Sequence, residues 1–299
     1  MKNNFLQDFI KQKQIYLFIA PGLILLLVFN YYPIFTALYR CMYTWDGVTA
    51  KFIGFGNFTR MINDHALRSS VPNVLFLTFF AVGVALTIPL IAAEVVFNLK
   101  NERSRYFYRV LFTIPMVVPW MVTLMVWRFI YDPQAGILNQ ILTGMGLKKF
   151  TGVWLGDPKI VLWCLAFIAF PWVAGFNFLI YMAGLENIST EIYDSALIDG
   201  ATGFIRFLKI DIPLIMGQIK LIFIMTIITQ IQAFQNVLVL TKGGPGYSSM
   251  VPGYVMYRSA FMYTRMGYAS AIGVAIAIFL LGLTIINMKF IKTTIEYES

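Results

Sequence analysis

Uncharged polar side chains interrupt an otherwise apolar run at positions 221–241, among them Thr226, Thr229, Gln230, Gln232, Gln235 and Asn236. Hydroxyl and amide groups donate and accept hydrogen bonds, and burying them without partners costs free energy. Thr226, Gln230 and Ala233 recur at i, i+4 and i+7, with Thr229 beside Gln230, so one helix face carries them. Such a face can bond to a neighbouring helix or to a polar solute in a wet cavity, and both interpretations stay open.

A second polar concentration is acidic. Five of the chain's 14 Asp and Glu residues fall at 186–213, namely Glu186, Glu191, Asp194, Asp199 and Asp211. Helical spacing predicts a short helix capped by Ser189 or Thr190 and ended by Gly200, which suits a left-handed C-terminus. A second short helix would place Phe204, Phe207 and Leu208 on one side, and Pro213 can open the next helix.

Two interpretations fit this acidic segment. It could lie on the membrane surface, or it could dock a soluble partner. The acid-rich composition disfavours the first, because anionic lipid attracts Lys and Arg instead.

No residues form a recognisable catalytic or metal-binding pattern. The sequence has no G-x-x-x-x-G-K-[ST] phosphate loop, so we expect the chain to bind no ATP itself. Cys41 and Cys164 lie far apart without Cys or His at metal-ligand spacing, which supports neither a disulfide nor a metal site. We therefore predict no catalytic residue, no metal and no cofactor in this chain.

Composition places the protein in a membrane. Of 299 residues, 59% are apolar and only 12% are charged. So few charges cannot cover this much apolar surface in water, which excludes an ordinary soluble enzyme, a disordered protein and a disulfide-rich secreted module. The net charge of +9 comes from basic residues lying between apolar runs. They are typical of loops that set membrane orientation, and we expect no nucleic-acid partner.

Long charge-poor runs predict an all-α integral membrane protein with six transmembrane helices, because a spanning helix needs about 20 apolar residues. We expect the spans at about 14–39, 69–93, 110–131, 160–185, 214–241 and 266–288. The alternation of a membrane barrel is absent. Residues 14–291 would form the membrane domain, with the acidic loop at 186–213 and with cytoplasmic tails at 1–13 and 292–299.

Orientation follows from the densest basic segments, at the N-terminus and at 100–109, which are expected in the cytoplasm with both termini. Glu94, at the inner end of the second span, is expected to pair with a nearby base such as Arg103 or Arg105, or to extend inward to the membrane surface.

The acidic segment resembles the coupling motif of ATP-binding-cassette importer permeases, whose pattern is Glu-Ala-Ala, then Asp-Gly-Ala, then Phe, Ile and Leu-Pro. Here the first triplet is Asp-Ser-Ala at 194–196 and the second is Asp-Gly-Ala at 199–201. Phe207, Ile210 and Pro213 follow at the family's spacing. Asp194, Ser195 and Asp211 depart from the family's usual residues.

Other motifs are similar to the carbohydrate-importer branch, specifically the larger maltose permease and the glycerol-phosphate permease. They are GFGNF (54–58), WRFIYDP (127–133), GFN (175–177), LTKGGP (240–245) and MGYASA (266–271). The resemblance covers about residues 15–290 and implies the type I importer permease fold.

This resemblance implies a permease subunit of an ATP-driven oligosaccharide importer in the bacterial cytoplasmic membrane. Its partners would be a second related permease, two cytoplasmic subunits that bind ATP and Mg, an extracellular solute-binding protein, a carbohydrate and the lipid bilayer. Residues 189–211 would transmit ATPase closure, and the residues implied in coupling are Glu191, Tyr193, Asp194, Ala196, Asp199, Gly200, Ala201, Phe207 and Pro213.

The resemblance also implies a substrate cavity, lined by Phe170, Trp172, Val173, Phe176, Thr226, Thr229, Gln230 and Ala233. Aromatic faces that stack on sugar rings would combine there with groups that bond sugar hydroxyls.

Two rivals come from other classes. An ion-coupled secondary transporter predicts charges deep in the spans and two similar halves with broken helices, and the sequence has neither feature clearly. A purely structural scaffold is disfavoured by the polar residues at 221–241.

Overall fold

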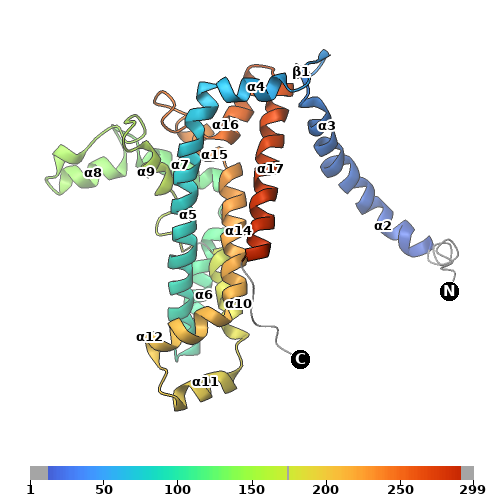
Figure 1. The fold of residues 1–299 in the computed structure, drawn as a ribbon. Helices are drawn as coiled ribbons and strands as arrows, with labels where there is room; N and C mark the ends of the chain where they lie inside the picture. Colours follow the sequence, from blue (N-terminus) through green and yellow to red (C-terminus); the bar gives the residue numbers. More distant parts are fainter. Residues whose placement is uncertain (1–12, 174, 291–299) are drawn as a thin grey trace, which may run out of the picture. The chain divides into compact units, whose positions relative to one another are not determined.

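The computed structural model describes residues 13–173 and 175–290 (Figure 1). The predicted cytoplasmic tails, 1–13 and 292–299, fall outside the described residues, apart from Lys13. The chain divides into two compact units. The first contains residues up to Ile62 together with Met256–Ala275, and the second contains Asn63–Val255 together with residues from Ile276.

The first unit begins with a long apolar helix. Helix α2 (Lys13–Leu26) continues through a π-helical turn (Leu27–Tyr31) into α3 (Tyr32–Arg40). An antiparallel hairpin of β1 (Tyr43–Trp45) and β2 (Ala50–Phe52) follows, with Thr44 opposite Lys51, and leads into α4 (Gly56–Asn63). The unit is completed by a later part of the chain: the end of α16 (Pro252–Tyr257), a π-helical turn (Arg258–Met262) and the start of α17 (Met266–Phe290).

One asparagine fixes the hairpin to α4. Asn57 is buried, and its Nδ2 donates to the carbonyl oxygens of Cys41 and Tyr43, each at 2.8 Å. Gly267, at the start of α17, approaches the Tyr43 carbonyl so closely that a Cβ atom would not fit. These contacts explain the glycine of MGYASA and the asparagine of GFGNF. The predicted loop after the first span is therefore an ordered hairpin and helix.

The second unit is built around α5 (His65–Phe97), 33 residues long and capped by Asp64, whose carboxylate accepts from the amides of Ala66 and Leu67. Its other elements are α6 (Glu102–Thr113), a 3-10 turn (Ile114–Val117), α7 (Trp120–Ile130), α8 (Ile137–Gly144), a 3-10 turn (Lys148–Phe150), α9 (Val161–Ala166), α10 (Gly175–Glu186), α11 (Thr190–Ile198), α12 (Gly203–Arg206), a π-helical turn (Phe207–Asp211), α13 (Ile212–Leu214), α14 (Met216–Gln232) and α15 (Gln235–Leu240).

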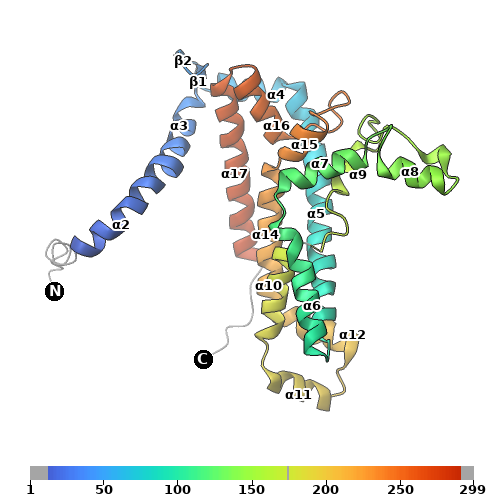
Figure 2. The ribbon, with the colours of Figure 1, turned by 180° about the vertical axis from the view of Figure 1, so that it is seen from behind.

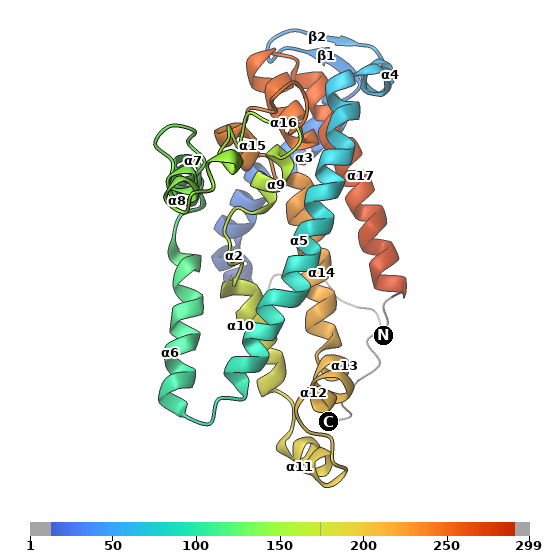
Figure 3. The same ribbon diagram turned by 90° about the vertical axis from the view of Figure 1, so that its left-hand side faces the viewer.

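Helices α10 and α14 both pack along α5, and their fully buried side chains include Phe178, Tyr181, Leu185 and Ile222 (Figure 3). Gly184 allows α10 to approach α14, because a Cβ there would lie 3.0 Å from the Gln218 side chain. Figure 2, the view from behind, shows α11 and α12 at the end of this helix group.

Within residues 13–173 and 175–290, four helices are long and apolar enough to span a membrane: Tyr16–Arg40, His65–Phe97, Met216–Leu240 and Met266–Lys289. A fifth candidate is the pair Glu102–Val117 and Trp120–Ile130, bent by 89° at its break. The predicted span at 110–131 is therefore bent, at a break between Pro115 and Pro119, because proline lacks the N–H that continues a helix. The predicted span at 160–185 is two short helices, α9 and α10, separated at Pro171. The count of six spans stays a prediction.

The Asn57 contacts predict the behaviour of the hairpin. Replacing Asn57 with Ala removes two hydrogen bonds worth about 1 kcal/mol each and leaves two carbonyls without these partners. Together these make about 2 kcal/mol, so we expect the amides of 43–52 to exchange with solvent roughly thirtyfold faster, since 1.4 kcal/mol is a factor of ten. Hydrogen–deuterium exchange of the purified protein measures this, with peptides from α14 as the internal control. Unchanged exchange at 43–52 would show that Asn57 does not hold the hairpin.

Candidate functional site: a docking segment and a polar cavity

The acidic segment forms the predicted short helix, and its Asp-Gly-Ala triplet ends it. Asp199 is the C-cap of α11, and Gly200 follows at φ +75°, the left-handed region that favours glycine. The Gly200 amide donates to the Leu197 carbonyl at 3.2 Å, and the Ala201 amide donates to the Ala196 carbonyl at 2.8 Å. This pair of bonds is the Schellman helix end. Ser189 is the N-cap as expected, but its side chain makes no capping hydrogen bond.

Helix α11 has two different faces. Ile192 and Tyr193 pack against the core of the second unit, as does Phe207 further along, and Ala196 is buried. The opposite face is exposed and carries the carboxylates of Glu191 and Asp194.

Two large apolar side chains lie on this exposed face as well. Leu197 is 65% exposed and Ile198 is 87% exposed. Acidic side chains around exposed leucine and isoleucine form a surface suited to a protein partner.

The inner side of the segment is attached to α5 by one partly buried guanidinium. Arg206 Nη2 lies 2.7 Å from Glu94 Oε1 and 2.8 Å from Asn98 Oδ1, while its Nε lies 3.0 Å from Asp211 Oδ2. Asp211 is fully buried and the Arg206 side chain is 20% exposed. The guanidinium also lies 5.1 Å from the ring centroid of Tyr193 on α11. The expected pairing of Glu94 with Arg103 or Arg105 is therefore wrong, because Arg206 folds back from the acidic loop to reach Glu94.

Burial governs the charges here. It raises the pKa of the Tyr193 phenol, and the neighbouring Asp211 carboxylate raises it further. Burial alone would lower the pKa of Arg206, but the Asp211 and Glu94 carboxylates outweigh it and leave that pKa above its ordinary value. Tyr193 is consequently neutral and Arg206 is charged throughout the physiological pH range.

A second ion pair lies where the segment begins. Glu186, at the end of α10, pairs with Arg109 of α6. The loop is thus anchored by a charge pair at its entrance and by Arg206 near its exit, and both anchors reach helices that precede it in the chain.

Thr226 and Gln230 of α14 line a cavity of about 230 Å³ inside the second unit. Its polar lining consists of Asn177, Thr226, Gln230 and Asn236, and its aromatic lining of Phe80, Trp120 and Trp172. The remaining lining residues are Leu77, Ala81, Val84, Ala85, Pro89, Leu165, Ala166, Ile168 and Ala169. Trp120 Nε1 donates to Asn236 Oδ1 at 2.9 Å, and the rings of Phe80 and Trp172 meet edge to face at 5.6 Å.

Three of the eight expected cavity residues, Trp172, Thr226 and Gln230, line this space. The others, Phe170, Val173, Phe176, Thr229 and Ala233, do not. Phe170 lines a separate apolar cavity, and Phe176 is 52% exposed. The spacing argument assumed continuous helices, whereas residues 167–173 are a loop and Ala233 has the extended backbone that ends α14.

Sequence reasoning missed most of the cavity lining, including three residues that carry N–H or amide groups, and it missed one structural residue. Trp120, Asn177 and Asn236 join the cavity from three further elements, although Asn236 stood out as a polar residue in the fifth predicted span. Arg206 carried no signal beyond its place in the acidic loop. Within the part of the chain described, no group of three or more His, Cys, Asp or Glu side chains could hold a metal ion.

Comparisons with known proteins agree with this architecture. Residues 85–292 match the family described as "Binding-protein-dependent transport system inner membrane component". The chain is 31% identical over 280 residues to the probable ABC transporter permease protein YurN of Bacillus subtilis, covering 93% of this chain and 96% of that one. It is also 31% identical over 271 residues to the diacetylchitobiose uptake system permease protein NgcF of Streptomyces coelicolor, covering 87% and 77%.

A solved structure shares the fold. A chain of a bacterial alginate ABC transporter, crystallised with an alginate pentasaccharide-bound periplasmic protein, superposes with a TM-score of 0.82 over 94% of both chains at 20% identity. The protein studied here belongs to the binding-protein-dependent transport system inner membrane component family and is a multi-pass permease subunit of an ABC importer. The resemblance of its acidic loop and motifs to that family is confirmed.

The Arg206 contacts predict a specific instability. Replacing Arg206 with Gln leaves the buried Asp211 carboxylate and the partly buried Glu94 carboxylate without their cation, and breaking a buried pair costs about 3–5 kcal/mol. We expect amides of 189–211 to exchange at least a hundredfold faster in the purified protein.

Lys209→Gln removes the same charge from an exposed position in the same loop and is the matched control. Adding Glu94→Gln and Asp211→Asn to Arg206→Gln removes the unpaired carboxylates, so part of the protection should return. Equal exchange in the Arg206 and Lys209 variants would show that Arg206 does not hold the segment.

Proposed function

We propose that this permease forms half of the translocation pathway of an ATP-driven saccharide importer, with a second related permease forming the other half. Two cytoplasmic subunits bind ATP and Mg, and this chain binds neither. An extracellular solute-binding protein delivers the sugar. The complex lies in the bacterial cytoplasmic membrane with both termini of this chain in the cytoplasm.

The lining of the cavity carries the substrate proposal. Trp120 and Trp172 offer aromatic faces, while Gln230, Thr226 and Asn177 offer amide and hydroxyl groups. Stacking faces together with neutral hydrogen-bonding groups suit a pyranose ring with its hydroxyls. No Asp, Glu, Lys or Arg belongs to the lining of this cavity as the described residues form it, which favours a neutral saccharide.

The volume of the cavity supports a shared pathway. About 230 Å³ is below the roughly 300–1,000 Å³ typical of complete ligand pockets. A second permease would supply the facing wall. The relatives fit this substrate class, since NgcF is named for diacetylchitobiose uptake and the solved relative for alginate.

Coupling to the ATPase rests on α11. Its exposed face presents Glu191, Asp194, Leu197 and Ile198, whereas its inner face is held to α5 through Arg206. Movement of a partner bound to the outer face would therefore move α5, which also lines the cavity between Leu77 and Pro89.

The residues expected in coupling divide into two groups. Those exposed for contact with a partner are Glu191, Asp194, Asp199 and Gly200, and those packed on the inner side of the helix are Tyr193, Ala196 and Phe207. Family membership gives no support to the ion-coupled alternative.

Reconstitution tests the proposal. The two permeases and the two ATP-binding subunits are assembled in lipid nanodiscs. ATP hydrolysis is then measured in the presence of the solute-binding protein and a panel of neutral saccharides, uronates and sugar phosphates. We expect stimulation by at least one neutral saccharide. A complex that responds only to charged sugars, or to no saccharide, would contradict it.

Gln230 should determine part of the sugar response. Gln230→Ala removes a neutral hydrogen bond worth about 0.5–1.5 kcal/mol, so we expect transport of the preferred saccharide to fall roughly three- to tenfold and the order of preference to change. Gln232→Ala is the matched control, because Gln232 is exposed and lies outside the cavity lining. Rate and preference left unchanged by Gln230→Ala would remove this residue from the pathway.

A further inference from the structure

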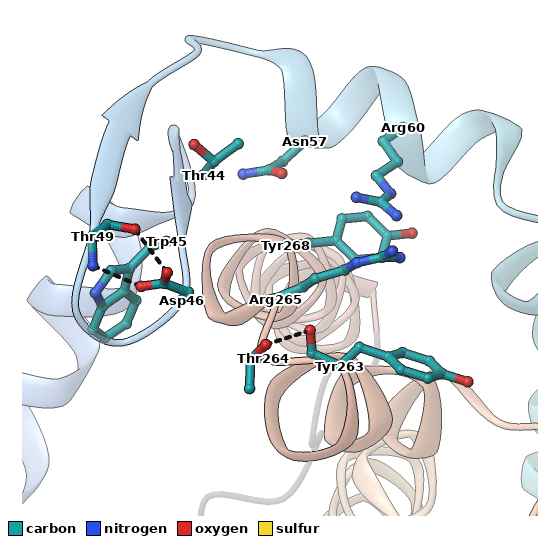
Figure 4. Close-up of a pocket in the computed structure, with 10 residues that line it drawn as sticks. All are labelled: Thr44, Trp45, Asp46, Thr49, Asn57, Arg60, Tyr263, Thr264, Arg265 and Tyr268. Atoms are coloured by element: carbon teal, nitrogen blue, oxygen red, sulfur yellow. Dashed lines mark hydrogen bonds between the residues drawn. The ribbon is translucent and has the colours of Figure 1, made fainter.

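A polar pocket of about 270 Å³ lies within the first unit (Figure 4). It is lined by the hairpin, by α4 and by the segment that precedes and begins α17. The lining residues are Thr44, Trp45, Asp46, Thr49, Asn57, Arg60, Tyr263, Thr264, Arg265 and Tyr268. Neither the cavity of the second unit nor the docking segment includes any of them.

Two guanidinium groups face this pocket without a carboxylate partner. Arg60 lies 4.8 Å from the ring centroid of Tyr268, and Arg265 lies 5.7 Å from that of Tyr263. In Figure 4, Arg60 extends from α4 towards the Tyr268 ring. Neither guanidinium forms an ion pair or donates a hydrogen bond among the described residues. Stacking on an aromatic ring fixes a guanidinium while leaving its N–H edge open to an acceptor in its plane.

Hydrogen bonds within the first unit fix the walls of the pocket. Asn57 bonds the hairpin to α4, and the Asp46 carboxylate accepts from the Val48 amide at 2.9 Å and from the Thr49 hydroxyl at 2.7 Å. Thr264 has φ +49°, an uncommon conformation for a β-branched residue. This backbone lies between Tyr263 and Arg265 and places both side chains on the pocket. Unusual backbone of this kind concentrates at functional sites.

Exposed apolar and aromatic side chains occur on the same three segments as the pocket. They are Val48, Phe52, Phe55, Phe261, Met262 and Tyr263, between 48% and 91% exposed. Protein–protein interfaces are enriched in arginine, tyrosine, other aromatic residues and methionine, and this surface has all of them. The Asp46 carboxylate on the pocket wall is held within the hairpin turn by the Thr49 hydroxyl and the Val48 and Thr49 amides, which lower its pKa.

Chain topology sets the side of the membrane on which segment 41–63 lies. Segment 41–63 joins the end of α3 to the start of α5, and Glu94 at the other end of α5 bonds Arg206 of the docking segment. Thirty-three helical residues extend about 50 Å, more than the roughly 30 Å of a bilayer's hydrocarbon core. The two ends of α5 therefore emerge on opposite faces of the membrane, and segment 41–63 joins α5 at the end opposite to the one that bonds the docking segment.

We propose that this pocket receives an Asp or Glu side chain of the solute-binding protein, with Arg60 and Arg265 donating to its carboxylate. The proposal rests on the proposed function, which supplies that partner. The aromatic and apolar side chains around the two arginines would cover the pair and exclude water, as neutral contacts do around interface hot spots.

Binding to the assembled transporter tests this. The probe is the solute-binding protein found to stimulate ATP hydrolysis of the unmodified complex, and its affinity is measured for transporter in nanodiscs. The double variant Arg60→Glu, Arg265→Glu should weaken binding at least tenfold. The matched control, Lys148→Glu with Lys149→Glu, makes the same charge change outside the pocket and should weaken it less than threefold.

A second measurement identifies the contact itself. In the Arg60→Lys and Arg265→Lys variants, a carbodiimide should couple the new amine to a carboxylate of the bound protein, identified by mass spectrometry. An affinity unchanged by the double reversal, an equal loss in the control, or an effect present only in nanodiscs with anionic lipid would overturn the pocket assignment. If the unmodified complex responds to no binding protein, it is the proposed function that fails.

Discussion

The organisation of the second unit depends on one partly buried cation. Arg206 of the acidic loop bonds carboxylates from two parts of the chain, Glu94 and Asp211. A buried ion pair of this kind contributes little net stability over apolar packing, yet removing one partner is costly, so its main consequence is to permit one arrangement of the loop. Because the Tyr193 ring lies over the same guanidinium, α11 is oriented by the interaction that attaches α12. The outer face of α11 is thereby left free for another protein.

In a membrane, the contacts between helices depend on small residues and polar groups more than on apolar burial. Apolar helices gain nothing from facing one another rather than lipid, so small residues and polar groups determine where they meet. Gly184 permits the close approach of α10 and α14, and Asn73 of α5 donates to the carbonyls of Tyr247 and Met250, each at 2.9 Å. The breaks between α6 and α7 and between α9 and α10 lie beside the cavity, where irregular backbone can be accommodated because it faces protein or water instead of lipid.

Local signals predicted local structure well. The acids, the Ser189 and Gly200 positions and Pro213 define a helix, a left-handed end and a new start, and the structure has each of them because short-range backbone chemistry decides them. The site predictions assumed regular helices, whereas the chain is broken near its prolines, so Trp172 lines the cavity while Phe170 and Phe176 do not. The Glu94 partner was also beyond reach, since two residues 112 positions apart meet only through the folded loop. Trp120 and Asn177 belong to the cavity for the same long-range reason.

The central claim is that the docking segment and α5 move as one body. Spin labels at Ser195 on α11 and Val95 on α5, both exposed positions, report the distance between them in the complete transporter, with Cys41 and Cys164 first replaced by alanine. The decisive measurement is the distance between the two labels, obtained by double electron–electron resonance in the ATP-free and ATP-bound complexes. The Arg206 attachment predicts the same distance distribution in both states. A distribution that shifts on ATP binding would show that the segment moves independently of α5 and would contradict this account of coupling.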